Sequence, residues 1–228
     1  DNEDLMSLPM GVLLDDRYEI IGKLGSGGFG IVYEARDREA SGDIFAIKEY
    51  VPDLCVRHQG SRTVSPRHAR DKQAFEDGLK AFVEEARTLR ELDHPNIVRV
   101  FHWFKQHGTA YIVMRRLRGQ TLEGRIDNGE RLEGKAALKL TRDLLSALQS
   151  IHDKGLLHRD ISPSNVFVLE DGTPTLLDFG AARFAIGKVS QRLTAIARHG
   201  YTPREQYDEY GIEVQSPPTD FYALGATL

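Results

Sequence analysis

Several common sequence features are scarce or missing in this chain of 228 residues. Cys55 is the only cysteine, which excludes an internal disulfide and indicates a reducing compartment or indifference to redox conditions. No apolar run reaches the roughly 18 residues that a membrane helix needs. No signal-peptide pattern, repeat or low-complexity tract occurs either. We therefore expect no membrane contact within this segment and a cytoplasmic location, as a whole protein or as the cytoplasmic domain of a larger one.

An excess of one sign of charge is also lacking. The 30 Lys and Arg residues face 34 Asp and Glu residues, which gives a net charge of −4. This balance gives no indication of nucleic-acid binding, although it leaves a local basic patch open. The hydrophobic share of 40% and the charged share of 28% are typical of globular proteins. The length suffices for one large domain or two small lobes.

The first part of the chain is typical of a β-sheet. Five segments rich in β-branched and aromatic residues are expected as strands: "YEIIGKL", "IVYEARD", "IFAIKEY", "IVRVFHWF" and "TAYIVM". The helical spacing of apolar residues predicts an amphipathic helix over residues 75–92, before the fourth of these strands. Residues 1–17 are acidic and irregular, and we expect them to form a flexible lead-in.

A polar stretch at residues 52–72 separates the third strand from this helix. Charge runs of this kind are usually solvated, so we expect a loop. Its basic side chains either cover the outer face of the helix, which we favour, or hold an acidic partner or a phosphate. They are Arg57, His58, Arg62, Arg67, His68 and Arg70.

The second part has a different character. A long helix is predicted over residues 135–153, with Gly155 as its C-terminal cap and two short strands, "VFVLE" and "TLLDF", after it. We predict a mostly β lobe over residues 18–114, a connector over 115–119 and a mostly helical lobe over 120–228. The apolar stripe of the long helix is expected to contain Leu138, Leu144, Leu145, Leu148 and Ile151.

The glycine-rich stretch "GSGGFG" is the first candidate for chemistry. A dinucleotide-binding turn would need a helix directly after the glycines, but the next residues are Ile31, Val32 and Tyr33, which predict a strand. The glycines then occupy a hairpin tip, which is either a plain flexible turn or a place where backbone N–H groups approach phosphate oxygens. The tip comprises Gly25, Ser26, Gly27, Gly28, Phe29 and Gly30.

Lys48 follows this tip in an apolar strand, "FAIK". A lysine there either extends to the solvent or binds a phosphate as a point charge beneath the glycines. The second role needs an anion that orients the lysine, and the predicted helix offers Glu84 and Glu85. Since adjacent helix positions face different directions, only one can serve, and we choose Glu85.

Two later segments supply oxygen ligands. "HRDISPSN" contains Asp160 and Asn165, and Asp178 begins "DFG". An amide and a carboxylate from separate loops suit Mg²⁺, which prefers oxygen ligands and keeps several waters. With Asn165 and Asp178 assigned to the metal, Asp160 is the candidate acceptor of a hydroxyl proton.

Taken in order, these motifs resemble the signature set of the protein kinases, in particular the bacterial branch of the eukaryotic-type (Hanks-type) Ser/Thr kinases. "GSGGFG", "FAIK", the helix glutamate, "HRDISPSN", "DFG", "GYTPRE" and "DFYALG" occur in the family's order from residue 18 to the last residue. The resemblance implies an α+β, bilobal fold with a mainly β N-lobe and a mainly α, incomplete C-lobe. It also implies ATP and Mg²⁺ as cofactors, protein substrates and a role in signalling.

The resemblance assigns roles to single residues. Lys48 pairs with the ATP phosphates and with Glu85, Asp178 and Asn165 hold Mg²⁺, and Asp160 orients and deprotonates the acceptor hydroxyl. In the nucleotide site, Met114 is the gatekeeper, Arg115 to Leu117 form the hinge, and Val32, Ala46 and Phe167 enclose the adenine. A hydrophobic stack that aligns the lobes consists of Leu89, Val100, His158 and Phe179, with Asp220 as its anchor.

The chain departs from the family pattern at two positions that are usually paired. Ser162 stands where Ser/Thr kinases carry a lysine that contacts the transferred phosphate, and Arg198 stands where they carry a threonine. Arg198 either supplies the missing charge or is a solvated arginine. Three functions therefore remain open: a Ser/Thr kinase, a nucleotide-binding pseudokinase or scaffold, or a kinase fragment that is inactive because its C-lobe is truncated.

The resemblance also suggests regulation by phosphorylation. Arg159 is expected to bind a phosphorylated activation loop, with Ser190 and Thr194 as candidate acceptors, so autophosphorylation or self-association is a candidate interaction. Tyr201 and Thr202 are expected to be structural.

The family continues with further helices beyond the point where this sequence ends. Those helices supply an arginine to the glutamate that matches Glu205. In their absence we expect Leu224 and Leu228 of the last predicted helix to lack packing partners, so that a chain ending here would be marginally stable, oligomeric or rescued by a partner.

Overall fold

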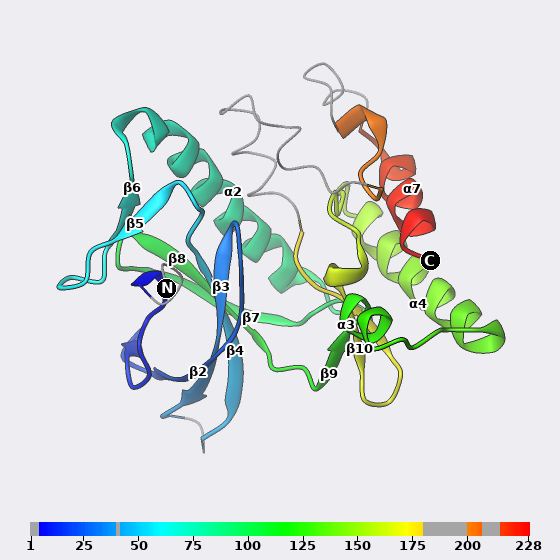
Figure 1. The fold of residues 1–228 in the computed structure, drawn as a ribbon, viewed down its shortest axis with the longest axis horizontal. Helices are drawn as coiled ribbons and strands as arrows, with labels where there is room; N and C mark the ends of the chain where they lie inside the picture. Colours follow the sequence, from blue (N-terminus) through cyan, green and yellow to red (C-terminus); the bar gives the residue numbers. More distant parts are fainter. Residues whose placement is uncertain (1–4, 40–41, 180–199, 207–214) are drawn as a thin grey trace. The chain divides into compact units, whose positions relative to one another are not determined.

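The computed structural model describes residues 5–39, 42–179, 200–206 and 215–228. The chain divides into two compact units (Figure 1). The first consists of Asp1–Glu91 and Arg99–Arg116, and the second of Leu92–Val98 and Leu117–Leu228. In the described part of the chain, no helix combines the length and the apolar character needed to cross a membrane.

The first unit is built on a six-stranded antiparallel sheet with the order β1-β2-β3-β4-β8-β7. All five predicted strands are present, as β2, β3, β4, β7 and β8. The predicted helix is α2 (Lys72–Glu91), which packs against β7 and β8. The strands are β1 (Leu13–Leu14), β2 (Tyr18–Gly27), β3 (Gly30–Asp37), β4 (Ile44–Tyr50), β7 (Val100–Gln106) and β8 (Thr109–Arg115).

Side chains alternate between the two faces of this sheet, as pleated strands require. Tyr33 and Ile47 are opposite each other in β3 and β4, and both are fully buried in the main apolar core. Leu8, Val12 and Leu14 belong to the same core, and β1 pairs with β2. The expectation of a flexible lead-in is therefore wrong for these residues, because their apolar side chains cover the sheet.

The polar stretch after β4 is not a solvated loop. It forms a hairpin of β5 (Cys55–Arg57) and β6 (Val64–Pro66), followed by the short helix η1 (Ala69–Asp71). Arg57 is buried and donates to the Glu49 carboxylate over 2.6 Å. Thus Arg57 does not cover the outer face of α2, since its partner lies on the sheet.

Among the described residues, the second unit contains a three-stranded sheet, β11-β10-β9, together with three α-helices and two 3₁₀-helices. The long predicted helix is α4, but Leu138 and Leu145 are exposed, whereas Leu140, Leu144 and Leu148 are buried. Gly155 follows α4 in a left-handed conformation (φ 70°), as its capping role requires. The bounds are β9 (Gly119–Thr121), α3 (Leu122–Asp127), α4 (Gly134–His152), η2 (Pro163–Asn165), β10 (Val166–Leu169), β11 (Pro174–Leu176), η3 (Arg204–Gln206) and α7 (Pro217–Thr227).

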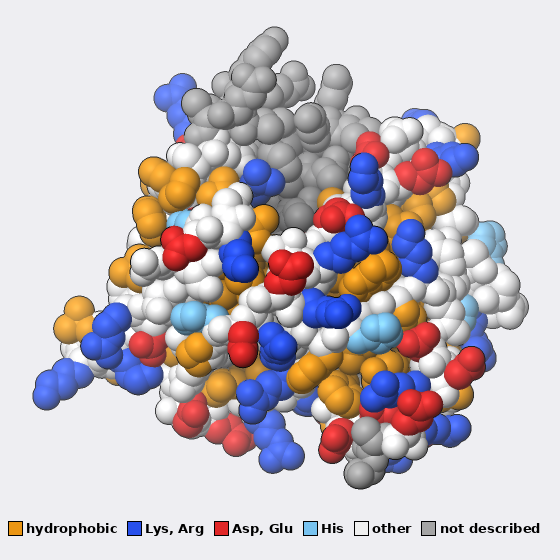
Figure 2. Space-filling view, turned by 180° about the vertical axis from the view of Figure 1, so that it is seen from behind, with side chains coloured by type: hydrophobic (Ala, Val, Ile, Leu, Met, Phe, Trp, Pro, Cys, Tyr) orange, Lys and Arg blue, Asp and Glu red, His pale blue; other side chains and the backbone are white. Residues whose placement is uncertain are grey.

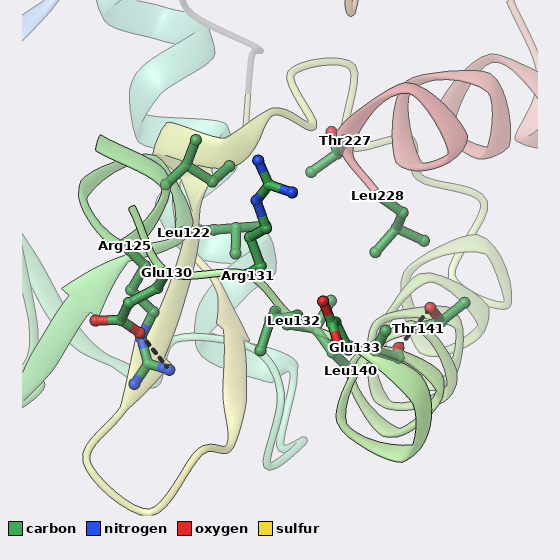
Figure 3. A pocket seen from close by; sticks show the side chains of 12 residues that line it. Leu122, Arg125, Glu130, Arg131, Leu132, Glu133, Leu140, Thr141, Thr227 and Leu228 are labelled. Carbon is green, nitrogen blue, oxygen red and sulfur yellow. Dashed lines mark hydrogen bonds and ion pairs between the residues drawn. The ribbon is translucent and has the colours of Figure 1, made fainter. Parts of the chain in front are cut away.

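A pocket of about 440 Å³ lies within the second unit, between α3, the segment after it, α4 and the end of α7 (Figure 3). Leu140 and Leu228 both line it, and Arg125 and Glu130 form an ion pair of 3.6 Å at its edge. Leu228 is exposed, as expected. The expectation is wrong for Leu224, which is buried among the described residues.

Charges of both signs are mixed on the surface. On the face drawn in Figure 2, Lys and Arg side chains alternate with Asp and Glu side chains. This mixture agrees with the balanced composition.

Candidate active site

The glycine-rich motif forms the tip of the β2–β3 hairpin, as predicted. Gly27 pairs with Gly30, which leaves Gly28 and Phe29 as the two residues of the turn. Gly25, Ser26, Gly27 and Gly28 are exposed, so their backbone groups are accessible to a ligand. At Gly30 glycine is required for space, because a Cβ there would collide with the carbonyl oxygen of Glu49.

Four predicted site residues share one face of the first unit's sheet. Val32 is opposite Lys48 in the β3–β4 register, and Ala46 is opposite Met114 in the β4–β8 register. Residues two apart in a strand lie on the same face, so Ala46 and Lys48 point in the same direction. This is the face opposite to the Tyr33 core. Val32 and Lys48 are half-buried, whereas Ala46 and Met114 are buried.

The helix α2 brings Glu85 to the Lys48 side of the sheet. Phe82 of α2 lies under the Lys48 ammonium, 5.6 Å from nitrogen to ring centroid, and also packs against Tyr50. Glu85 follows Phe82 by three positions and is buried with it on one helix face. Glu84 is exposed and pairs with Arg87 over 2.6 Å. The helix geometry therefore favours Glu85 over Glu84.

The predicted hinge residues fall at the division between the two units. Arg115 is the exposed last residue of β8, and its backbone N–H donates to the Arg99 carbonyl over 2.9 Å. Leu117 is half-buried and begins the second stretch of the second unit.

The segment "HRDISPSN" places its polar side chains through hydrogen bonds of its own. The Asn165 amide donates to the Asp160 carboxylate over 2.7 Å and to the Asp160 carbonyl over 2.8 Å. Its own backbone N–H donates to the Ser162 carbonyl within the η2 turn. Because the amide nitrogen faces Asp160, the amide oxygen is the atom of Asn165 that would contact a cation.

A buried carboxylate from α7 anchors this loop. The two Asp220 oxygens accept the backbone N–H groups of His158 (2.9 Å) and Arg159 (2.8 Å), and His152 contacts Asp220 over 2.8 Å. Arg159 adopts a left-handed conformation (φ 64°), which costs about 1–3 kcal/mol for a residue other than glycine. Burial also lowers the pKa of Arg159. The bonds to Asp220 hold this unfavourable backbone in place.

The second unit also assembles part of the predicted hydrophobic stack. The His158 and Phe179 rings are stacked at 4.6 Å with an interplanar angle of 26°, and both residues are buried. Asp178 precedes Phe179 and is half-buried. The other two predicted members, Leu89 and Val100, are buried within the first unit.

Ser162 is almost fully buried, at 1% exposure. Its hydroxyl lies 3.1 Å from the Ser164 hydroxyl. The side chain at the family's lysine position thus belongs to the packing of the loop. Phe167 lies in β10, opposite Thr121 of β9 and Thr175 of β11, and is half-buried.

The sequence analysis did not identify His152 as a contributor, or Thr219 as a partner of Glu205. His152 is a third partner of Asp220, and it could have been suspected from its place at the end of α4 beside the predicted loop. Glu205 accepts a hydrogen bond from the Thr219 hydroxyl over 2.9 Å, an interaction without a local sequence signal. Arg198, Ser190 and Thr194 lie outside the described residues.

Comparison with known proteins places this geometry in a family. The protein kinase domain family matches residues 18–228. The chain belongs to the protein kinase family. Its α+β fold and the order of its motifs agree with the expected resemblance.

Bacterial Ser/Thr kinases are among the relatives. A probable serine/threonine-protein kinase PknB of Lactococcus lactis is 31% identical over 97% of this chain. Serine/threonine-protein kinase D of Synechocystis is 31% identical over 96% of it. The chain spans 32% and 41% of the lengths of these two relatives.

Two solved structures share the fold. "PpkA-294 apo form" superposes with a TM-score of 0.87 and is 38% identical, covering 97% of this chain and 76% of its own. The PknI kinase domain of M. tuberculosis has a TM-score of 0.70 at 23% identity, covering 97% of this chain and 74% of its own.

The oxygen donors of the second unit fit Mg²⁺. Among the residues that the structure describes, no group of three or more His, Cys, Asp and Glu side chains forms a metal site. Kinases hold Mg²⁺ with a carboxylate and an amide together with nucleotide phosphates, so a larger protein ligand set is not required. Asp178 and Asn165 are the carboxylate and the amide that the sequence predicts for such a site.

Proposed function

We propose that this kinase domain transfers the γ-phosphate of ATP to serine or threonine hydroxyls of proteins. The observation that carries the proposal is the Asn165–Asp160 hydrogen-bond pair in a loop anchored on Asp220. This pair fixes one oxygen of Asp160, the group that accepts the hydroxyl proton. Positioning of this kind supplies much of the acceleration of phosphoryl transfer.

We assign the remaining roles from the face of the sheet, or the loop, on which each residue lies. The Val32–Lys48 face of the sheet carries the adenine-covering residues and the lysine that binds the phosphates, while Glu85 orients Lys48. Asn165 and Asp178 hold Mg²⁺, which neutralises developing phosphate charge when bound. Phe167 completes the adenine site, with Met114 as gatekeeper and Arg115 to Leu117 as hinge.

The pairing of Ser162 with Ser164 gives Ser162 a different role from the family's lysine. We propose that its hydroxyl stabilises the loop between Asp160 and Asn165 and carries no charge to the transferred phosphate. Charge compensation then depends on Lys48 and the metal site. Activity toward protein substrates is therefore expected with Ser162 in place.

The test is transfer of labelled γ-phosphate to a generic protein substrate, compared between wild type and Asp160→Asn. Loss of a catalytic base of this type lowers the rate by about 10²–10⁴-fold. Asp171→Asn is the matched control, since Asp171 is an exposed carboxylate in the β10–β11 turn. Phosphoamino-acid analysis should find label on serine and threonine. Nucleotide binding by the wild type without any transfer would support a pseudokinase and contradict the proposal.

A further inference from the structure

The tip of the glycine-rich hairpin has backbone partners outside its own hairpin. The Asp53 N–H donates to the Gly28 carbonyl over 3.0 Å, and the Val51 N–H donates to the Phe29 carbonyl over 3.3 Å. These bonds continue the β3–β4 ladder beyond its last pair, Gly30 and Tyr50. The segment after β4 therefore restrains the two residues at the tip of the turn.

That segment is in turn held by the β5–β6 hairpin. The Cys55 N–H donates to the Pro52 carbonyl over 2.9 Å, which closes a turn with Asp53 at its second position. The Arg67 guanidinium donates to the Cys55 carbonyl over 3.1 Å and to the Asp53 carbonyl over 3.4 Å. The Arg67 backbone N–H donates to the Leu54 carbonyl over 2.8 Å.

The hairpin is attached to the sheet at a separate place. The buried Arg57–Glu49 pair connects β5 to β4, and the Val64 N–H of β6 donates to the His107 carbonyl over 2.8 Å. Since these contacts do not involve the glycine tip, the hairpin can serve as a fixed support for the turn at Asp53.

A cavity lies beside the tip on the side of this segment. The cavity has a volume of about 340 Å³. Its lining includes Gly28 and Ile31 of the glycine hairpin, Cys55 at the end of the Asp53 turn, and Arg67, which follows β6. Ile31 lies on the face opposite to Val32 and Lys48, so the cavity borders the reverse side of the proposed nucleotide-binding face. The two backbone hydrogen bonds from Val51 and Asp53 therefore hold the tip beside an open space.

We infer that the Asp53 turn, supported by the β5–β6 hairpin, positions the glycine-rich tip for nucleotide phosphates, with the Asp53 backbone N–H as the positioning group. This inference rests on the proposed function. A tip held in one conformation loses less conformational entropy when it binds phosphate, so affinity for the nucleotide rises.

Asp53→Pro and Asp53→Ala form a matched pair of variants that tests this. Both remove the carboxylate, but only proline removes the N–H that bonds to Gly28. Proline is favoured at the second position of such a turn, so the turn itself is retained. In the full protein, we expect the KM for ATP of Asp53→Pro to exceed that of Asp53→Ala by about three- to tenfold, with kcat within about twofold.

Amide hydrogen exchange without nucleotide provides a readout that does not depend on activity. Exchange at residues 28–30 should be faster in Asp53→Pro than in Asp53→Ala, while exchange in β8 should be equal. Equal exchange at the tip in the two variants would overturn the inference. A wild type that binds no nucleotide would instead refute the proposed function, and the exchange comparison would still decide whether the turn restrains the tip.

Arg67→Ala provides a second test should Asp53→Pro fail to fold. Its effect on exchange and on the KM should have the same direction, and Arg67→Lys should restore part of it because one donor returns. Arg70→Ala is the control, since Arg70 is an exposed arginine three residues further along the chain. An Arg67→Ala variant that matches Arg70→Ala in both measurements would contradict the role of the hairpin.

Discussion

Glu49 in the first unit and Asp220 in the second are both fully buried carboxylates, but their partners differ. Glu49 accepts hydrogen bonds from side chains on three other strands: the Tyr33 and Tyr111 hydroxyls and the Arg57 guanidinium. Asp220 accepts the backbone N–H groups of the loop that carries Asp160. The first carboxylate therefore joins elements of the fold, whereas the second determines the backbone conformation of the proposed catalytic loop.

The two networks also differ in how they depend on charge. The Glu49 carboxylate and the Arg57 side chain are 0% and 2% exposed, so each compensates the buried charge of the other. Burial and the Glu49 carboxylate together raise the pKa of Tyr33 and Tyr111, which keeps both hydroxyls protonated as donors. Asp220 depends mainly on neutral backbone donors. Substitutions should thus affect stability most at Glu49 and activity most at Asp220.

The largest effect is expected for Asp220→Ala. This change removes the acceptor of the His158 and Arg159 backbone N–H groups. The strained backbone of Arg159 is then no longer stabilised, so Asp160 is no longer held in place. A displacement of this kind lowers the transfer rate by about 10²-fold or more. Steady-state kinetics on folded protein checks this, and a kcat close to the wild-type value would contradict the anchoring role.

Arg57→Met should reduce stability and have less effect on chemistry. It leaves the Glu49 charge buried and uncompensated, which costs about 3–5 kcal/mol in the free energy of unfolding. Urea denaturation gives this quantity, and kcat per folded molecule should change far less than in Asp220→Ala. A loss of less than about 1 kcal/mol in the free energy of unfolding is typical of exposed ion pairs. Such a result would contradict the burial of the Arg57–Glu49 pair.

The double variant Glu49→Gln with Arg57→Met sharpens the same point. Glutamine removes the charge and keeps one acceptor oxygen for a tyrosine hydroxyl, while its NH₂ group can donate to the other hydroxyl oxygen. The double variant should therefore recover more than half of the stability lost in Arg57→Met. The measurement is again urea denaturation, with both single variants in parallel. Strictly additive losses would indicate that the charge is not the cause.

His152→Phe should have a smaller effect on the Asp220 network. The substitution removes one of three contacts and retains a ring against Phe221, which lies 5.4 Å from the His152 ring. We expect a loss of about 1 kcal/mol in the free energy of unfolding and a modest decrease in kcat. Thermal denaturation and kinetics test this, and an effect equal to that of Asp220→Ala would mean that His152 is the main anchor.

The smallest effect concerns Cys55 at high pH. Burial raises the pKa of the Cys55 thiol from 9.0 to about 12, so the folded protein keeps a proton that the unfolded chain releases. Stability should therefore fall as the pH rises above about 9 and be unaffected by this group below it. Cys55→Ala should remove that part of the alkaline slope. A thiol reagent that modifies native Cys55 quickly at pH 8 would contradict the burial of the thiol.

Local sequence patterns were sufficient for most of the elements and for much of the site. The alternation in "FAIK" and "IVYEARD" predicts strands, and the glycines before them predict the hairpin tip, because both signals depend on residues close in sequence. Helix geometry indicated that only one of Glu84 and Glu85 can face the sheet, and the burial of Glu85 supports the choice of that residue. The stripe of α4 was misassigned at Leu138 and Leu145, since apolar residues can also lie on an exposed helix face.

The polar stretch after β4 could not be interpreted in this way. Arg57 has the sequence surroundings of a solvated charge, and its partner Glu49 is also charged, so neither residue signals burial by itself. The same holds for residues 8–14, whose few apolar side chains become part of the core only because the sheet presents an uncovered apolar face. Both errors concern contacts between separate elements of the fold.

The sequence by itself determined the strands and helices, the glycine turn and the identity of the chemical groups, because local sterics and the spacing of apolar residues govern these. The tertiary structure decided which charges are buried and which atoms hold the loops. Asp220 lies 60 residues after Asp160 in the sequence. Arg67 donates to the turn at Asp53, and the Asp53 N–H donates to Gly28. Hydrogen bonds between such distant groups depend on how the chain closes in space, and no local pattern of residues specifies that.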